Sequence, residues 1–152
     1  MRRLLAAAAV LLAVAAAVAV SPLFPSFENR PSSEVCVGMP GDFPPDSVKR
    51  FPEAGVFVVC DGKGIFAVSG KCTHLGCPLQ WDEKKDDFRC DCHGSRFDAE
   101  GRVITSPARE PLPHYAITYR EGVGLVVDTS RASTDPAEWK KEPYYFPLGD
   151  ER

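Results

Sequence analysis

One stretch of the chain, residues 72–98 with the sequence CTHLGCPLQWDEKKDDFRCDCHGSRFD, holds four of the six cysteines and two of the three histidines. Its side chains form two pairs: a C-x-H pair at Cys72 and His74, and a C-x-x-H pair at Cys90 and His93. Each pair offers one thiolate and one imidazole, which are good ligands for transition metals. The stretch therefore predicts a metal site formed by two loops.

The two remaining cysteines of this stretch, Cys77 and Cys92, lie one in each predicted loop. Two flexible loops need a constraint other than the metal to hold a fixed geometry. A disulfide between these cysteines would supply that constraint directly. Such a bond persists where thiols are not kept reduced, which would place the domain outside the cytoplasm.

The motifs CTHLGC and CDCHGSRFD resemble the two cluster-binding loops of Rieske iron–sulfur proteins. They are most similar to the disulfide-containing type found in quinol-oxidising cytochrome bc and b6f complexes, and the resemblance covers about residues 34–128. It implies a [2Fe-2S] cluster in which Cys72 and Cys90 hold one iron while His74 and His93 hold the other. It also implies a disulfide between the other two cysteines of the stretch.

Two cysteines and two histidines are also the ligand set of a structural zinc site. Zinc sites of this composition usually keep both cysteines in one loop and both histidines in the other, whereas here each loop holds one of each. The ligand pattern therefore favours an iron–sulfur cluster. A zinc-binding structural module without redox activity is the alternative.

The resemblance assigns tuning roles to two residues beyond the second pair. It implies that the Ser95 hydroxyl donates to a bridging sulfide, whereas Phe97 replaces a tyrosine that in many relatives donates to a ligand sulfur. Because each donor stabilises the reduced cluster, the missing hydroxyl predicts a potential in the lower half of the Rieske range of roughly −150 to +300 mV. Such a potential suits menaquinol better than ubiquinol.

Other residues near the predicted ligands have structural roles. Gly76 and Gly94 allow the loops to bend tightly. By resemblance, Leu75 is an exposed apolar shield beside the histidines; a core residue is the alternative. Pro107 lies in the sequence SPAREPLP of residues 106–113, which resembles the proline-rich loop that covers the cluster, although a rigid surface turn would have the same composition.

The function implied by the resemblance is electron transfer from quinol to a c-type cytochrome, in a bacterial quinol:cytochrome c reductase that also contains cytochrome b. His93 matches the quinol-facing ligand of the family, and His74 also lies at the tip. The two imidazoles would gain and lose outer protons with the redox state of the cluster. The alternative is the small Rieske subunit of an exported oxidoreductase such as arsenite oxidase, in which quinol does not contact the cluster.

Outside the two motifs, short β-rich runs separated by turn residues predict an all-β fold. We expect an antiparallel β-sandwich of the Rieske type, with a smaller cluster-binding part carried on loops at one end and no helix inside the domain. The predicted strands are 34–37, 48–51, 56–60, 65–68, 88–89, 102–105, 114–120 and 124–128.

A single hydrophobic helix is predicted before the domain, because no polar residue occurs from Leu4 to Val20. As a helix these residues would span about 26 Å, near the lower limit for crossing a bilayer. They form either a membrane anchor that leaves the domain outside the cytoplasm, which the resemblance favours, or a cleaved signal peptide. The predicted segments are 1–20 as anchor or signal, 21–33 as a proline-rich linker, 34–128 as the Rieske domain and 129–152 as a C-terminal tail.

Several residues outside the motifs also allow predictions. The net charge of −3 gives no indication of a nucleic-acid partner. Cys36 and Cys60 fall in predicted strands, either as a second disulfide or as buried free thiols. His114 has no ligand spacing and is predicted to be a surface histidine. The aromatic residues of the tail would pack on the domain itself or on another subunit.

Overall fold

The computed structural model describes residues 33–149. The predicted N-terminal helix, and the choice between a membrane anchor and a cleaved signal peptide, lie outside these residues. Within the described range, no helix has the length and apolar character needed to cross a membrane.

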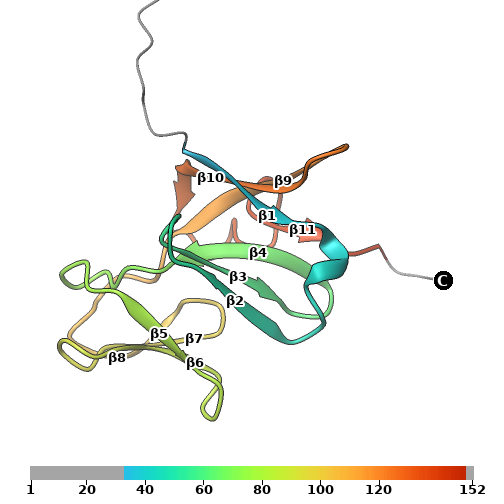
Figure 1. Cartoon of the computed structure of the whole chain (residues 1–152). Coiled ribbons are helices and arrows are strands. Elements are labelled where there is room, and N and C mark those ends of the chain that lie inside the picture. Colours follow the sequence, from blue (N-terminus) through green and yellow to red (C-terminus); the bar gives the residue numbers. More distant parts are fainter. Residues whose placement is uncertain (1–32, 150–152) are drawn as a thin grey trace, which may run out of the picture. The chain divides into compact units, whose positions relative to one another are not determined.

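Two antiparallel β-sheets form the described part of the chain (Figure 1). The larger sheet consists of β1 (Glu34–Gly38), β2 (Ser47–Phe51), β3 (Val56–Cys60), β4 (Gly64–Ser69), β9 (His114–Arg120), β10 (Gly124–Ser133) and β11 (Phe146–Pro147). The smaller sheet consists of β5 (Leu79–Asp82), β6 (Asp87–Cys90), β7 (Arg96–Asp98) and β8 (Val103–Thr105). The strand orders are β1-β10-β9-β4-β3-β2, with β11 beside β4, and β5-β6-β7-β8. The predicted all-β antiparallel fold is confirmed: in residues 33–149 the only helical element is the three-residue 3-10 turn η2 (Pro40–Asp42).

The central strands of the larger sheet, β3 and β4, are buried on both faces. Their sequences, VFVVC and GIFAVS, lack the alternation of polar and apolar residues typical of a half-buried strand. Because successive side chains point to opposite faces, Phe57 and Phe66 lie in one core cluster, whereas Val58 and Ile65 lie in another. The first cluster faces the smaller sheet, and the second is enclosed by the larger sheet itself.

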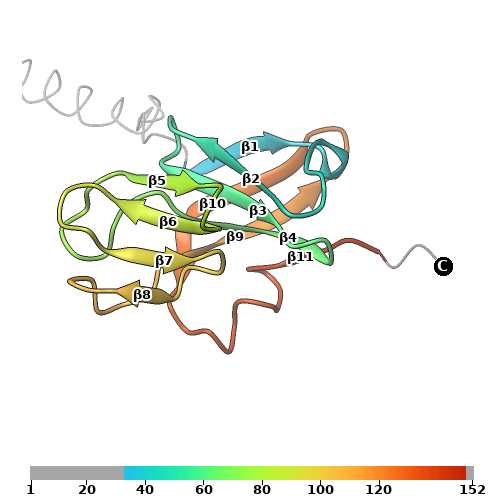
Figure 2. The ribbon, with the colours of Figure 1, turned by 90° about the horizontal axis from the view of Figure 1, so that it is seen from below.

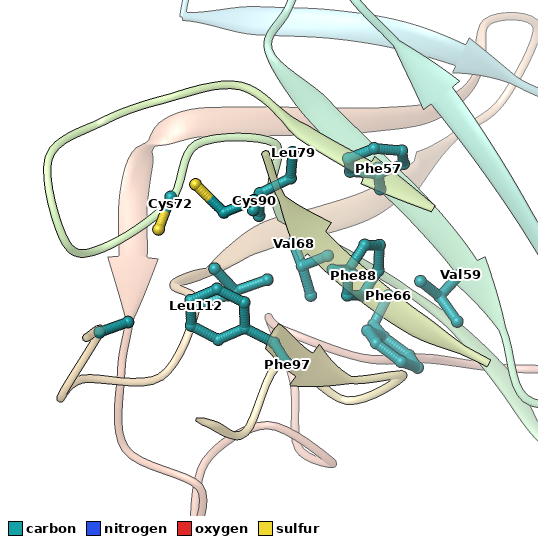
Figure 3. Close-up of a cluster of buried hydrophobic side chains, with 11 residues drawn as sticks. Phe57, Val59, Phe66, Val68, Cys72, Leu79, Phe88, Cys90, Phe97 and Leu112 are labelled. Atoms are coloured by element: carbon teal, nitrogen blue, oxygen red, sulfur yellow. The ribbon is translucent and has the colours of Figure 1, made fainter. Parts of the chain in front are cut away.

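The core cluster between the two sheets extends to the predicted metal-binding loops (Figure 3). Leu79 of β5, Phe88 of β6 and Phe97 of β7 are fully buried there. Cys72 and Cys90 belong to the same cluster. The two thiols therefore rest on a packed apolar layer to which both sheets contribute.

Every predicted strand overlaps a strand of the structure, but the sequence did not predict β5, β7 or β11. These strands are four, three and two residues long, too short to show a clear periodicity. The smaller part, in which two strands were predicted at 88–89 and 102–105, has a four-stranded sheet of its own. The loops extend from this sheet.

The C-terminal tail packs on its own domain rather than leaving it. Strand β10 continues to Ser133, beyond the predicted strand end at 128, and β11 pairs with β4 through Phe146 and Ile65. Trp139 is only 1% exposed. Of the two alternatives for the tail, the described residues therefore show the packed one.

His114 is not a surface residue, so that prediction was wrong. Its side chain is 1% exposed and lies between two aromatic rings, with ring centroids 5.0 Å from Phe66 and 4.2 Å from Trp139. Burial lowers the pKa of His114 to about 4. No local pattern indicates this burial, because Trp139 lies 25 positions further along the chain.

Cys36 and Cys60 do not form a second disulfide, because both thiols are free. Cys60 is buried on β3, as expected for a free thiol in a strand, whereas Cys36 is exposed on β1. The Cys36 Sγ lies 3.2 Å from the carbonyl oxygen of Val123 and donates a hydrogen bond to it.

Candidate metal centre

The first loop, residues 72–77, joins β4 to β5 and is closed by two hydrogen bonds to the backbone of its first residue. The amide of Cys72 donates to the carbonyl of Cys77 at 2.8 Å, and the amide of Gly76 donates to the carbonyl of Cys72 at 2.8 Å. Gly76 has a φ of 75°, a conformation that glycine adopts without steric cost. The expected tight bend is therefore present.

The second loop, residues 90–95, joins β6 to β7 and has the same pattern. The amide of Cys90 donates to the carbonyl of Ser95 at 2.9 Å, and that of Gly94 donates to the carbonyl of Cys90 at 3.0 Å. Gly94 has a φ of 81°. The two loops thus present their predicted ligands from equivalent backbone frames.

The four predicted ligands converge, with sulfurs inside and imidazoles outside. Cys72 and Cys90 are buried beside each other at the end of the core cluster (Figure 3). The rings of His74 and His93 meet edge to face, with centroids 4.9 Å apart. His74 is partly buried and His93 is exposed. Two thiols and two imidazoles on facing loops form a donor set that suits a cluster with mixed sulfur and nitrogen ligation.

A second observation supports a metal at this position. The Nδ1 atom of His74 is buried and has no hydrogen-bond partner among residues 33–149. A buried polar atom without a partner costs free energy, and such atoms are rare in folded proteins. A metal bound to this nitrogen would satisfy it, so the residues fit the implied cofactor.

The predicted disulfide between Cys77 and Cys92 is confirmed, and it joins the first loop to the second. The Sγ atom of Cys90 lies within 4.8 Å of both bridged sulfurs. The bridged sulfurs are not thiolates, so they hold the loops together rather than compete for the metal.

The proline loop, residues 106–113, is tied to both cysteine loops. The Ala108 amide donates a hydrogen bond to the buried Ser95 Oγ at 3.0 Å. The Thr73 hydroxyl donates to the carbonyl of Glu110 at 2.6 Å. The proline loop is therefore more than a surface turn, because it completes a three-loop arrangement around the predicted ligands.

Other predicted tuning residues lie close to this arrangement. Leu75 is 69% exposed, which confirms the expected exposure and excludes the core alternative. Phe97 is fully buried in the core cluster that contains the two thiols. Pro107 is partly buried and lines a surface pocket together with His74. Their effects on the cluster stay predictions.

Sequence reasoning missed two residues that support the loops. Thr73, whose hydroxyl reaches the proline loop, lies inside the first motif but was assigned no role. Arg96 follows the second loop and forms ion pairs with Asp82 of β5 and Asp87 of β6. The hydrogen bond from Arg96 lowers the pKa of Asp82. The only available signal was a basic residue among acidic ones, which does not specify partners nine and fourteen positions away.

The two-sheet fold with paired Cys/His loops defines a class of iron–sulfur domain, and the comparisons agree. Residues 33–116 match the family described as the Rieske [2Fe-2S] domain. The chain belongs to this family, and a Rieske-type [2Fe-2S] cluster is its cofactor. The family match decides against the zinc alternative.

Two curated relatives are cytochrome b6-f complex iron-sulfur subunits. The one from Chlorobaculum tepidum is 36% identical over 119 residues, which cover 72% of this chain and 66% of the relative. The one from Chlorobaculum thiosulfatiphilum is 35% identical over 124 residues, which cover 75% and 68%. The aligned part of the chain thus spans about two thirds of each relative.

One solved structure, the hyperthermophilic respiratory Complex III, contains a similar chain. The two are 30% identical, with a TM-score of 0.50 and coverage of 78% of this chain and 92% of the other.

Proposed function

We propose that this chain is the Rieske subunit of a bacterial quinol:cytochrome c reductase and transfers single electrons from quinol to a c-type cytochrome. Cytochrome b would be its partner in the membrane. The observation that carries the proposal is the arrangement of the predicted ligands: the thiols of Cys72 and Cys90 are buried, whereas the imidazoles of His74 and His93 are more exposed. The similarity to subunits of cytochrome b6-f complexes and to a chain of a respiratory Complex III supports the same assignment.

We assign Cys72 and Cys90 as the residues that would hold one iron of the cluster, and His74 and His93 as those that would hold the other. When bound, the cluster supplies one-electron redox chemistry. Burial of the His74 Nδ1 atom supports ligation through this nitrogen, because it leaves Nε2 as the other ring atom able to hold a proton.

The protein's own groups would handle the proton that accompanies each electron. His93 is exposed, so its outer ring nitrogen can accept a hydrogen bond from a quinol hydroxyl and then take up the proton. His74 is partly buried and lies against His93, which makes it the secondary candidate. Leu75 is apolar and exposed, and would help to exclude water where a partner docks.

We further propose that menaquinol is the donor, since the site lacks one hydroxyl that would raise the potential. Phe97 is fully buried in the core cluster that holds both ligand thiols. Phe97→Tyr should raise the potential, measured by voltammetry of the full-length protein, because the new hydroxyl would favour the reduced state. Phe43→Tyr, which adds a hydroxyl in the other core cluster, is the control. An unchanged potential in Phe97→Tyr would contradict the argument.

The location proposed for the domain is the extracytoplasmic side of the cell membrane. The Cys77–Cys92 disulfide supports an oxidising compartment. The apolar residues 4–20 would serve as the single-pass anchor, with a cleaved signal peptide as the alternative.

The decisive experiment is purification of the tagged full-length chain from membranes of its host, followed by redox titration with electron paramagnetic resonance. We expect a Rieske signal, co-purifying haem b, and quinol:cytochrome c activity that His93→Ala abolishes. A Rieske signal accompanied by a molybdenum subunit without haem b would overturn the reductase assignment in favour of an exported oxidoreductase of the arsenite oxidase kind.

A further inference from the structure

Residues 134–149 of the C-terminal tail contact both sheets, although none of the site residues lies among them. Figure 2 shows the tail as an orange to red loop that leaves β10 and returns to β11. Between these strands lie Trp139 and Lys140, whose contacts connect the larger sheet to the turn between β7 and β8.

Lys140 joins two carboxylates that belong to different sheets. Its Nζ atom lies 2.5 Å from Asp61, in the turn after β3, and 3.2 Å from Glu100, in the turn between β7 and β8. The same ammonium lies 4.7 Å from the ring centroid of Phe66 and 4.9 Å from that of Tyr145. The Asp61 and Glu100 side chains are partly buried, at 27% and 31% exposed, whereas that of Lys140 is 43% exposed, so their attraction is screened somewhat less than that of a fully exposed pair.

The two carboxylates beside Lys140, those of Asp61 and Glu100, carry the negative charge that the lysine pairs with. Burial alone would raise the pKa of Asp61, yet hydrogen bonds from Lys140, from backbone amides and from Tyr145 hold that pKa below its ordinary value. The pKa of Glu100 is also lowered, because Arg102 and Lys140 outweigh the effect of burial. Both carboxylates are therefore ionised at neutral pH and available to the lysine.

Trp139 connects the tail to the same turn through His114. Its ring stacks on the ring of His114, and the Nε2 of His114 donates to the carbonyl oxygen of Glu100 at 2.9 Å. The guanidinium group of Arg102 lies over the Trp139 ring, 5.4 Å from its centroid. The β7–β8 turn is thus held to β9 through the backbone carbonyl of Glu100 and to the tail through the Glu100 carboxylate.

A cleft of about 240 Å³ between the two sheets shows why such a connection matters. Its lining includes Val59 and Phe66 of the larger sheet, Trp81 and Ala99 of the smaller part, and also Glu100. Side chains do not fill this space, so packing alone does not fix the sheets to each other there. The lysine joins them at the side of the cleft.

The β7–β8 turn is in turn connected to the metal centre. The amide of Leu112, at the end of the proline loop, donates to the carbonyl of Gly101 at 2.8 Å. The Leu112 side chain is fully buried in the core cluster that contains Cys72 and Cys90. Movement of the turn would therefore displace the proline loop and its bond to Ser95.

We propose that Lys140 is a positioning residue for the metal centre: it joins Asp61 to Glu100, and so holds the β7–β8 turn and the proline loop against the larger sheet. These contacts lie within this chain and would have the same effect whichever donor and acceptor the protein serves.

The test is hydrogen exchange by mass spectrometry on the full-length, cluster-loaded protein, with Lys140→Met compared to wild type. We expect peptides covering residues 99–112 to exchange roughly tenfold faster, while peptides of β3 and β4 are unchanged. Loss of visible cluster absorption in denaturant should also be faster. Lys140→Arg, which keeps the charge, should restore slow exchange.

Lys141→Met is the matched control, since Lys141 is an adjacent tail lysine whose partner within residues 33–149 is Glu138 of the tail itself. It should behave as wild type. Glu100→Gln should reproduce the effect of Lys140→Met, and the double variant should add little to either. Equal acceleration of all peptides, unchanged exchange in residues 99–112, or the same effect from Lys141→Met would each overturn the proposal.

Discussion

The first and second loops share a backbone but not a set of side chains. Both use a cysteine at the first position and a glycine at the fifth, and both close with the same two hydrogen bonds. The other positions differ in ways that decide their roles. The pairs are Thr73 and Asp91, His74 and Cys92, Leu75 and His93, and Cys77 and Ser95.

The shared backbone conformation, which we call the frame, is thus distinct from the side chains predicted to bind the metal. The frame needs only a turn with a positive φ at the fifth residue, and it contains nothing specific to a metal. The predicted ligand histidine occupies the third position in the first loop and the fourth in the second. This shift accompanies a difference in exposure, because His74 is partly buried whereas His93 is exposed. The second loop therefore offers the more accessible imidazole.

The sixth position shows a second division of labour. Cys77 ends the first loop and is bonded to the second loop through its disulfide. Ser95 ends the second loop, is fully buried, and accepts a hydrogen bond from the proline loop. The two sixth positions thus make different connections, one between the two loops and one to the proline loop, so the two constraints can be removed separately by mutation.

The largest expected effect is the loss of the cluster signal when the residue at the fourth position of the second loop is replaced by alanine. His93→Ala should abolish the Rieske signal in electron paramagnetic resonance, because a ligand is lost. Leu75→Ala, at the equivalent position of the first loop, should keep a full signal and iron content. A signal that survives in His93→Ala, or one that disappears in Leu75→Ala, would show that the ligand positions are wrongly assigned.

The next effect concerns the bond between the loops. The double variant Cys77→Ser/Cys92→Ser removes a cross-link between residues 15 positions apart, worth about 3 kcal/mol in the chain-entropy description. The denaturant midpoint for loss of visible absorption should fall accordingly. Cys36→Ser, which alters an exposed free thiol, is the control and should leave the midpoint unchanged. Equal midpoints for the two variants would contradict a stabilising role.

A smaller effect is expected at the sixth position of the second loop. Ser95→Ala leaves the Ala108 amide without its partner, at a cost of about 1–3 kcal/mol, and removes a donor near the cluster. The potential should fall on the order of 50 mV, since a tenfold change in a one-electron equilibrium equals about 59 mV. Voltammetry of the full-length protein measures this.

Thr73→Val separates the two consequences of that change. It removes a hydrogen bond from the first loop to the proline loop, but no donor that we assign to the cluster. It should therefore destabilise the protein slightly and leave the potential nearly unchanged. If both variants lower the potential equally, the position of the proline loop, rather than the serine hydroxyl, sets the potential.

The loops and the central strands could be predicted because their signals are local. Residues 72–98 contain both motifs within a short stretch. Strands β3, β4 and β9 are continuous β-rich runs between turn residues. The predicted bounds of β3 and β9 agree with the structure. The disulfide could be proposed because its two cysteines lie in the same two motifs as the ligands.

The parts that could not be predicted depend on contacts between distant residues. His114 is buried between Phe66 of β4 and Trp139, which folds back onto it, and no local pattern encodes that return. The exposure of Cys36 depends on the pairing of β1 with β10, about 90 positions further on. The three-residue strand β7 is held by its neighbours β6 and β8 rather than by its own propensity.

Replacing the glycine at the fifth position of each loop tests most directly whether the two backbones are equivalent. Gly76 and Gly94 have φ values of 75° and 81°, and a Cβ atom added at either would meet no atom within 4 Å. Alanine at each position therefore adds backbone strain without a clash, at a cost of roughly 1–2 kcal/mol. If the frames are equivalent, Gly76→Ala and Gly94→Ala should lower the denaturant midpoint by the same amount. Gly41→Ala, where space is equally open and φ is not positive, should cost much less. Unequal losses at the two loop glycines would mean that the frames differ in a property that their hydrogen bonds do not show.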